Sequence, residues 1–345
     1  MNRTGRIILT LFAVCIFSVG ITVSLYAADK MPPEKAGVIG QPEGKIAFIR
    51  DKNIWYMNAD GTNQTLVTEV TNADGRLSWT GNNRMIMFTR KGEFDVKGPN
   101  MMGGHHKLYD LFLAYLDSAE AHNTMFWRRI SEEMGSRDPD ILPDGKTVIF
   151  TKDMNAKYVT ASLPQYQICT MNSDGTNVKM LRENWIADDT LNPKNFITSP
   201  SMNLNGDVAF VYFENLQARG FGVMTKGNYS ISVDSAKILA GKNDKGVAPA
   251  WSPDGQWIAY VYNDINSNAV YITNAAQTER YLIFEPPVGT YVYTIPPSFS
   301  PDSKWLTFST TDGSVWIIDI TGNGARRLTG PGLDKAPAWS KAATK

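Results

Sequence analysis

The chain of 345 residues is long enough to bury a large core, and its 34 Lys and Arg balance its 34 Asp and Glu. A balanced charge produces no sequence-wide field that would attract nucleic acid or anionic lipid, so we expect neither as a partner. Aromatic residues make up 11% of the chain and accompany many Gly, Pro, Asn and Asp, which favours an all-β fold of short strands and tight turns.

Residues 1–28 have the pattern of a secretory signal peptide: a positive start, an apolar run from Ile7 to Leu25, and Ala27-Ala28 as the cleavage region. The alternative is an uncleaved membrane anchor, because a run of about nineteen residues approaches the length that crosses a bilayer. Residues 29–43 then form a linker. We expect a periplasmic or secreted protein that is not inserted in the membrane after cleavage, with Cys169 as its one thiol, buried as a small hydrophobe.

One unit recurs along the chain, and repeats of this length are typical of propellers and solenoids. Each copy contains an apolar strand, a tight turn and a second apolar strand. Five copies follow in chain order: Leu77–Phe88, Pro139–Phe150, Pro200–Phe210, Ala248–Tyr260 and Pro297–Phe308.

The sixth copy is divided between the chain ends. Ala336–Ser340 supplies the first strand and then stops, whereas Gly44–Ile49 supplies a second strand that no first strand precedes. We expect these halves to pair in one blade, which closes a ring of six and removes its free edges. A separation of Trp339 from Ile46 would contradict this architecture.

Within a unit, the pattern predicts a four-stranded antiparallel meander. Proline marks the beginning of the first strand, and a turn such as Ser252–Gly255 leads to the second. A third strand such as Ile54–Met57 leads to a further Asp-Gly turn, as in Asn58–Asn63 and Asn172–Asn177. A calcium loop is the alternative for these segments, but no Glu stands at the twelfth position, so we interpret them as hairpin turns.

The Pro-x-Trp-Ser-Pro-Asp-Gly segment and the Met-Asn-x-Asp-Gly-Thr turn resemble the WD-like repeats of TolB-type propellers over residues 44–345. This resemblance implies an all-β, six-bladed propeller of the periplasm that binds other proteins. The family also has an α/β domain before its propeller, which we expect this chain to lack.

In a four-stranded meander the first and third connections lie at the same end of the blade, so both kinds of Asp-Gly turn lie on one face. The connections between second and third strands lie on the opposite face, at 91–107, 153–165, 214–220 and 263–268, where we expect a partner to bind. The candidate contact residues are Phe94, Met101, Met102, His105, His106, Tyr158, Arg219, Phe221, Asn263 and Asp264. A loop without any partner is the alternative.

The sequence gives little support for catalysis or for metal binding. His105, His106 and His122 would bind a transition metal only if a third ligand converged with the adjacent pair. No Gly-x-Ser-x-Gly elbow occurs, and the acidic residues Asp138, Asp140, Asp188 and Asp189 are interpreted as loop charges rather than glycosidase carboxylates.

We therefore expect no catalytic residues, no metal and no cofactor, in a monomeric protein-binding or scaffolding module with a partner in the cell envelope. The alternative is a glycan-binding protein, or a metal-dependent polysaccharide lyase or hydrolase, that uses the same face.

Overall fold

The computed structural model describes most of the chain between Gly40 and Ala342. Residues outside the description are 1–39, 71, 96–104, 117–126, 132–134, 155, 157–164, 182–195, 230–244, 265–266 and 343–345. The expected signal peptide and most of the expected linker therefore lie outside the described residues. In the part of the chain that is described, no helix has the length and apolar character needed to cross a membrane.

The described strands form six antiparallel sheets, each a blade. Blades one to three, from the inner strand outward, are β23 (Lys335–Trp339), β1 (Lys45–Arg50), β2 (Asn53–Asn58) and β3 (Thr65–Thr68); β4 (Ala73–Trp79), β5 (Met85–Asp95), β6 (His105–Tyr115) and β7 (Trp127–Arg129); β8 (Ser136–Ile141), β9 (Thr147–Asp153), β10 (Tyr166–Asn172) and β11 (Lys179–Met180). Blades four to six are β12 (Phe196–Met202), β13 (Val208–Glu214) and β14 (Gln217–Met224); β15 (Gly246–Trp251), β16 (Trp257–Asp264), β17 (Ser267–Asn274) and β18 (Arg280–Phe284); β19 (Ser298–Phe299), β20 (Trp305–Thr310), β21 (Ser314–Asp319) and β22 (Arg326–Arg327).

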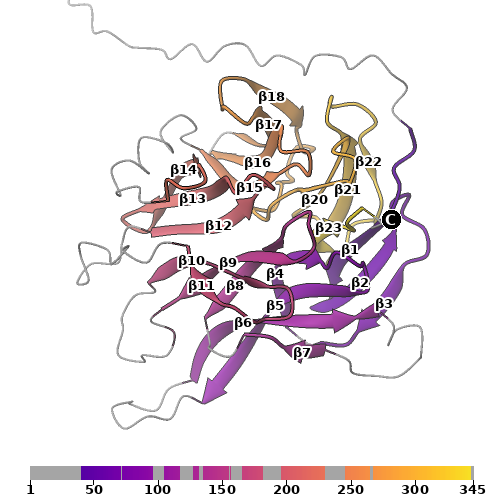
Figure 1. Ribbon diagram of the computed structural model, residues 1–345. Helices are drawn as coiled ribbons and strands as arrows, with labels where there is room; N and C mark the ends of the chain where they lie inside the picture. The colour runs from indigo at the N-terminus through magenta and orange to yellow at the C-terminus, as the bar shows by residue number, and fades with distance from the viewer. Residues whose placement is uncertain are drawn as a thin grey trace, which may run out of the picture.

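The blades surround a common axis (Figure 1). Their inner strands contact one another in the order β23, β4, β8, β12, β15 and β19, and β19 returns to β23. The fold is thus an all-β, six-bladed propeller, which confirms the architecture expected from the repeats.

The chain ends close the ring as the divided repeat predicted. Strand β23 pairs antiparallel with β1, and Ile46 lies opposite Trp339. The Lys45 amide donates to Ser340 Oγ at 3.0 Å, and Trp339 Nε1 donates to the Glu43 carbonyl at 2.8 Å. The first blade is therefore built from both ends of the chain.

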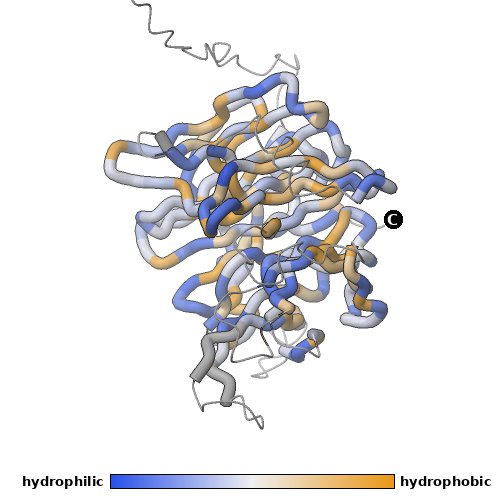
Figure 2. Tube along the Cα trace, turned by 90° about the vertical axis from the view of Figure 1, so that its left-hand side faces the viewer, coloured by the Kyte–Doolittle hydropathy of each residue, from blue (hydrophilic) through white to orange (hydrophobic). Residues whose placement is uncertain are grey.

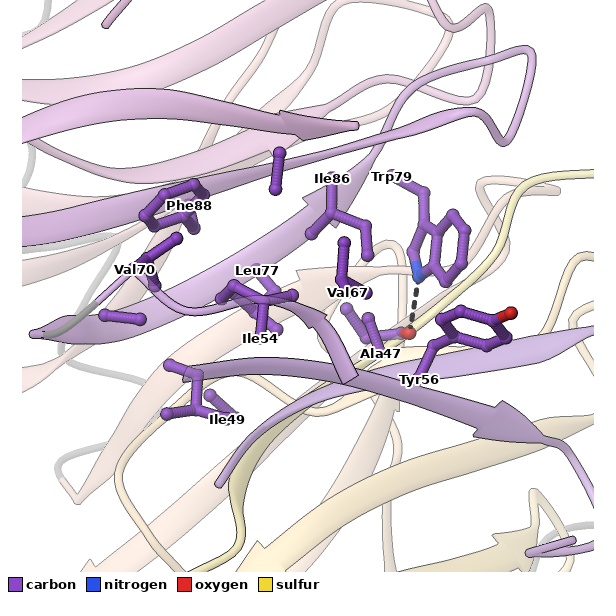
Figure 3. Packing of buried hydrophobic residues seen from close by; sticks show 14 of the residues in the cluster. Ala47, Ile49, Ile54, Tyr56, Val67, Val70, Leu77, Trp79, Ile86 and Phe88 are labelled. Carbon is purple, nitrogen blue, oxygen red and sulfur yellow. Dashed lines mark hydrogen bonds between the residues drawn. The ribbon is translucent and has the colours of Figure 1, made fainter. Parts of the chain in front are cut away.

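The hydrophobic core is divided among the interfaces between blades. Among the described residues, six apolar clusters each join one pair of neighbouring blades. Hydrophobic residues accordingly follow the strands, and hydrophilic ones predominate at the outer turns (Figure 2). Between blades one and two, Trp79 packs fully buried and its Nε1 donates to the Ala338 carbonyl at 2.9 Å (Figure 3). Cys169 is buried between blades two and three, as expected.

In four blades proline lies inside the inner strand rather than at its beginning, which differs from the expectation, whereas in blade six Pro297 directly precedes β19 as expected. In these four strands, the residue before the proline has a φ of 50–54°, in the left-handed region, and the strand register shifts there. A β-bulge leaves one residue out of the ladder, so it accommodates a proline that has no N–H to donate. The pairs are Asp138–Pro139, Ser199–Pro200, Ala248–Pro249 and Ala336–Pro337.

Candidate functional site

The face that carries the Asp-Gly turns, here called the turn face, is built from repeated hydrogen bonds. Asp60 Oδ1 accepts the Thr62 amide at 2.9 Å and its hydroxyl at 2.6 Å, and Asp174 binds Thr176 with the same two distances. These bonds lower the pKa of both carboxyls. The carboxylates hold their own turns, in agreement with the hairpin interpretation.

The opposite face, here called the loop face, carries the links between blades and the hairpins between second and third strands. In blade two the expected 91–107 loop is largely a hairpin, because β5 continues to Asp95 and β6 begins at His105. Phe94 lies opposite His106 in the ladder. Met101, Met102, Tyr158 and His122 lie outside the described residues.

Blade four has no long loop at 214–220. Asn215 and Leu216, with φ of 51° and 66°, form a two-residue turn, and β14 begins at Gln217. Arg219 is exposed and its Nε lies 3.3 Å from Glu214 Oε2. Phe221 does not lie on the surface, because it is fully buried against Tyr260 with ring centroids 4.7 Å apart. Its side chain belongs to the core between blades four and five.

In blade five, the two candidate residues connect the hairpin to its surroundings. Asp264 Oδ1 accepts a bond from Lys245 Nζ at 2.8 Å, and the Asn263 amide donates to the Lys245 carbonyl at 2.9 Å. Asn268, from the same hairpin, accepts a bond from the Val292 amide in the link to blade six. These polar groups stabilise the rim of the loop face.

Arg137 was not singled out from the sequence, although it occupies a central place between blades two and three. Its guanidinium lies 5.5 Å from the ring centroids of both Tyr109 and Tyr166, and its Nε bonds Asp138 Oδ2 at 2.8 Å. The Asp138 charge raises the pKa of Arg137, and burial raises that of Tyr166. The Arg-Asp-Pro triplet at an inner-strand bulge is the only signal for it in the sequence.

The axis of the ring is crossed by an ion pair. Arg76 Nη2 lies 3.0 Å from Asp140 Oδ1, and Asp140 Oδ2 accepts a bond from Ser201 Oγ at 2.6 Å. Arg76 also donates to the Pro200 carbonyl at 3.1 Å, so one guanidinium joins blades two, three and four. Asp138 and Asp140 are thus each paired with an arginine, whereas Asp188 and Asp189 lie outside the described residues.

The C-terminal segment covers the turn-face end of this axis. Asn83 exchanges two hydrogen bonds of 2.8 Å with the backbone of Lys341. The Lys341 ammonium donates to the Ile141 carbonyl at 2.6 Å, and burial lowers its pKa. A cavity of about 80 Å³ remains between Arg76 and Lys341.

Three exposed apolar side chains lie on the loop face near blade six: Val288 is fully exposed, and Tyr291 and Leu333 are 57% and 68% exposed. We call them the apolar rim. The Thr311 amide donates to the Tyr291 carbonyl at 2.7 Å, and the Tyr291 amide donates to Thr311 Oγ1 at 3.0 Å. The Gly332 amide, just before Leu333, donates to the Asp312 backbone carbonyl. Two separate interblade links therefore flank the same β20–β21 hairpin.

Comparison with known proteins gives structural similarity without a matching family model. TolB from Acinetobacter baumannii superposes with a TM-score of 0.64 at 18% identity, over 89% of this chain and 69% of that one. A putative TolB from Agrobacterium tumefaciens gives 0.53 at 12% identity, over 84% and 90% of the two chains. The fold is that of a TolB-like six-bladed β-propeller.

A third similar structure is a tricorn protease, with a TM-score of 0.54 and 13% identity over 84% of this chain and 26% of the protease. The TolB-like fold is therefore shared by proteins with different activities, and the fold alone does not assign one. Within the described residues of this TolB-like propeller, no group of three His, Cys, Asp or Glu is placed to hold a metal ion.

Proposed function

We propose that this TolB-like propeller is an exported protein that binds a partner protein of the cell envelope through its loop face. The fold supports a protein-binding scaffold in general terms. The observation that carries the proposal is the apolar rim, because large apolar side chains held exposed on an ordered scaffold are typical of contact surfaces.

The rim is held firmly by its backbone, as recognition requires. The link from Glu285 to Pro297 bonds along the end of β20, where the Tyr293 amide donates to the Ser309 carbonyl at 2.9 Å. Little conformational entropy is then lost when a partner covers Val288 and Tyr291. The proposed footprint extends from this rim to the β5–β6 hairpin and includes Arg219, Asn263 and Asp264.

Capture of partners from a native envelope extract tests the footprint. We expect immobilised protein in which Val288, Tyr291 and Leu333 are all changed to Ser to lose a partner that the wild type retains. The matched control changes Val178, Met180 and Leu204 to Ser, because these apolar residues are also exposed but lie outside the rim. Equal recovery of every partner by all three proteins would refute the rim as the docking surface.

A second variant tests the hairpin separately. Replacing Phe94–His106 by Asn-Gly keeps the Glu93–Lys107 pair and closes the ladder with a two-residue turn. We expect this variant to capture less of the partner than the wild type.

Export is tested by N-terminal sequencing of protein from the native host, which we expect to begin near Ala28; a chain that keeps residues 1–28 would contradict cleavage.

A further inference from the structure

A pocket of about 510 Å³ opens on the loop face between blades one and two. Its charged lining consists of Lys52, Lys91, Lys335 and Asp74. Three lysines and one aspartate thus line it. The pocket lies at the beginning of the inner strands β23 and β4, where the closing seam of the ring meets the second blade.

The backbone fixes all three lysines on well-anchored elements. Lys52 is at the tip of the β1–β2 hairpin, where it and Asp51 have φ values of 66° and 50°. Its carbonyl accepts the Ala73 amide at 2.9 Å, and the Lys91 amide donates to the Asn72 carbonyl at 3.0 Å. Lys335 begins the closing strand β23. The three lysines therefore line the pocket from one hairpin tip and two strands that the fold holds together.

Among the described residues, only one of the three lysines forms an ion pair with a carboxylate. Lys335 Nζ lies 2.7 Å from Asp74 Oδ1, while Asp334 is bound by Arg50 through two bonds of 2.7 Å. Burial raises the pKa of Asp74, but the bond and charge of Lys335 outweigh it and the pKa lies below its usual value. No carboxylate of the described residues pairs with Lys52 or Lys91, whose ammonium lies 5.7 Å from the Tyr109 ring.

We propose that this pocket binds carboxylate groups of an acidic polypeptide. The proposal rests on the proposed function and specifies the chemistry of the partner. An excess of two ammonium groups in a concave site favours an anionic occupant. Leu333 of the apolar rim is two residues from Lys335, so the occupant meets apolar and basic groups side by side. A polypeptide with acidic and apolar side chains offers both complementary chemistries.

Asp74 has a defined part in this binding. An arriving carboxylate competes with it for the Lys335 ammonium, so Asp74 weakens the interaction and selects ligands with more than one negative group. Removing the Asp74 charge therefore strengthens binding. A purely structural ion pair between Asp74 and Lys335 predicts no such gain.

Fluorescence anisotropy with a fluorescein-labelled decaglutamate peptide, at low ionic strength where exposed charges are least screened, tests the proposal. We expect the K52Q/K335Q double variant to bind about tenfold more weakly than the wild type, and D74N to bind about threefold more tightly. The matched controls are K226Q/K304Q and D302N, which change net charge equally on the turn face; we expect them to change affinity less than about twofold.

The results separate this proposal from the proposed function. Equal weakening by K52Q/K335Q and K226Q/K304Q, or no gain with D74N beyond that of D302N, would overturn the carboxylate pocket. Anionic phosphatidylglycerol vesicles or inorganic phosphate that displace the peptide from the wild type but not from K52Q/K335Q would instead assign the pocket to phosphate groups. Loss of envelope capture by the apolar-rim variant, with K52Q/K335Q unaffected, would leave the proposed function standing without the pocket.

Discussion

The two faces of the propeller differ in what their hydrogen bonds connect. On the turn face, Asp60 and Asp174 bind residues two positions away, so each turn stabilises itself. On the loop face, Asn268 and Thr311 bind links between blades, and Arg137 lies between two blades. The difference indicates that the turn face is framework, whereas the loop face is a joint surface to which several blades contribute. Variants on each face, and in the core between them, test this division.

The closing seam gives the largest expected effect. A chain truncated after Asp334 loses β23 and the Trp339 side chain, which is buried between blades six and one. Burying a large aromatic side chain alone contributes about 3–5 kcal/mol, and the edge of β1 is also exposed, so we expect the ring not to fold stably.

Circular dichroism during thermal unfolding measures this effect. The control is a chain truncated after Ala342, which keeps β23 and Lys341. If the chain truncated after Asp334 unfolded at the same temperature as the wild type, that result would contradict closure by the chain ends.

The interblade core gives the next effect. Changing Trp79 to Ala removes a fully buried indole between blades one and two, and we expect the free energy of unfolding to fall by about 3–5 kcal/mol. Trp79→Phe keeps most of the apolar volume but removes the hydrogen bond to the Ala338 carbonyl, with an expected loss of about 1 kcal/mol. Denaturant titration measures both, and a Trp79→Phe variant as stable as the wild type would show that the hydrogen bond contributes nothing.

A buried charge in blade two predicts a pH dependence. Asp110 is buried, and burial raises its pKa from 3.8 to about 6 although Arg129 lies 2.5 Å away and Ser131 donates to it at 2.9 Å. The folded protein therefore takes up this proton at a higher pH than the unfolded chain. The Asp110 contribution to stability is fully present below about pH 4 and is lost as the pH rises through about 6.

The comparison of wild type with Asp110→Asn isolates this titration, because Asn takes up no proton. We expect the difference in free energy of unfolding to shift by about 2 kcal/mol in favour of the wild type between pH 7 and pH 4. Denaturant titrations at several pH values measure it. A difference that stays constant over this range would contradict the raised pKa.

The smallest expected effect concerns the loop face. Replacing Phe94–His106 by Asn-Gly shortens a hairpin that extends beyond the body of its sheet, so we expect the free energy of unfolding to change by less than about 0.5 kcal/mol. Thermal unfolding measures this change. A large loss of stability would mean that the hairpin is part of the framework and would weaken the contrast between the faces.

The sequence predicted the architecture because each blade repeats the same local pattern, and the half-repeats at Gly44–Ile49 and Ala336–Ser340 specify closure. The site was less predictable. Phe221 was assigned to the surface because the two-residue turn at Asn215–Leu216 was taken for a loop, which shifted the start of β14. Arg76 and Arg137 were missed because their roles arise from contacts between blades, which a single repeat does not encode.

The hydrogen bonds at the closing seam place Gly44 and Ser340 side by side, and Gly40 and Ala342 line one pocket. A short peptide joining these two ends would yield a covalently circular ring. New termini could then be opened at an exposed turn such as Leu204–Gly206, since each blade interface has its own apolar cluster. The molecule is thus suited to circular permutation, with the cut moved from blade one to another blade without altering the arrangement of the sheets.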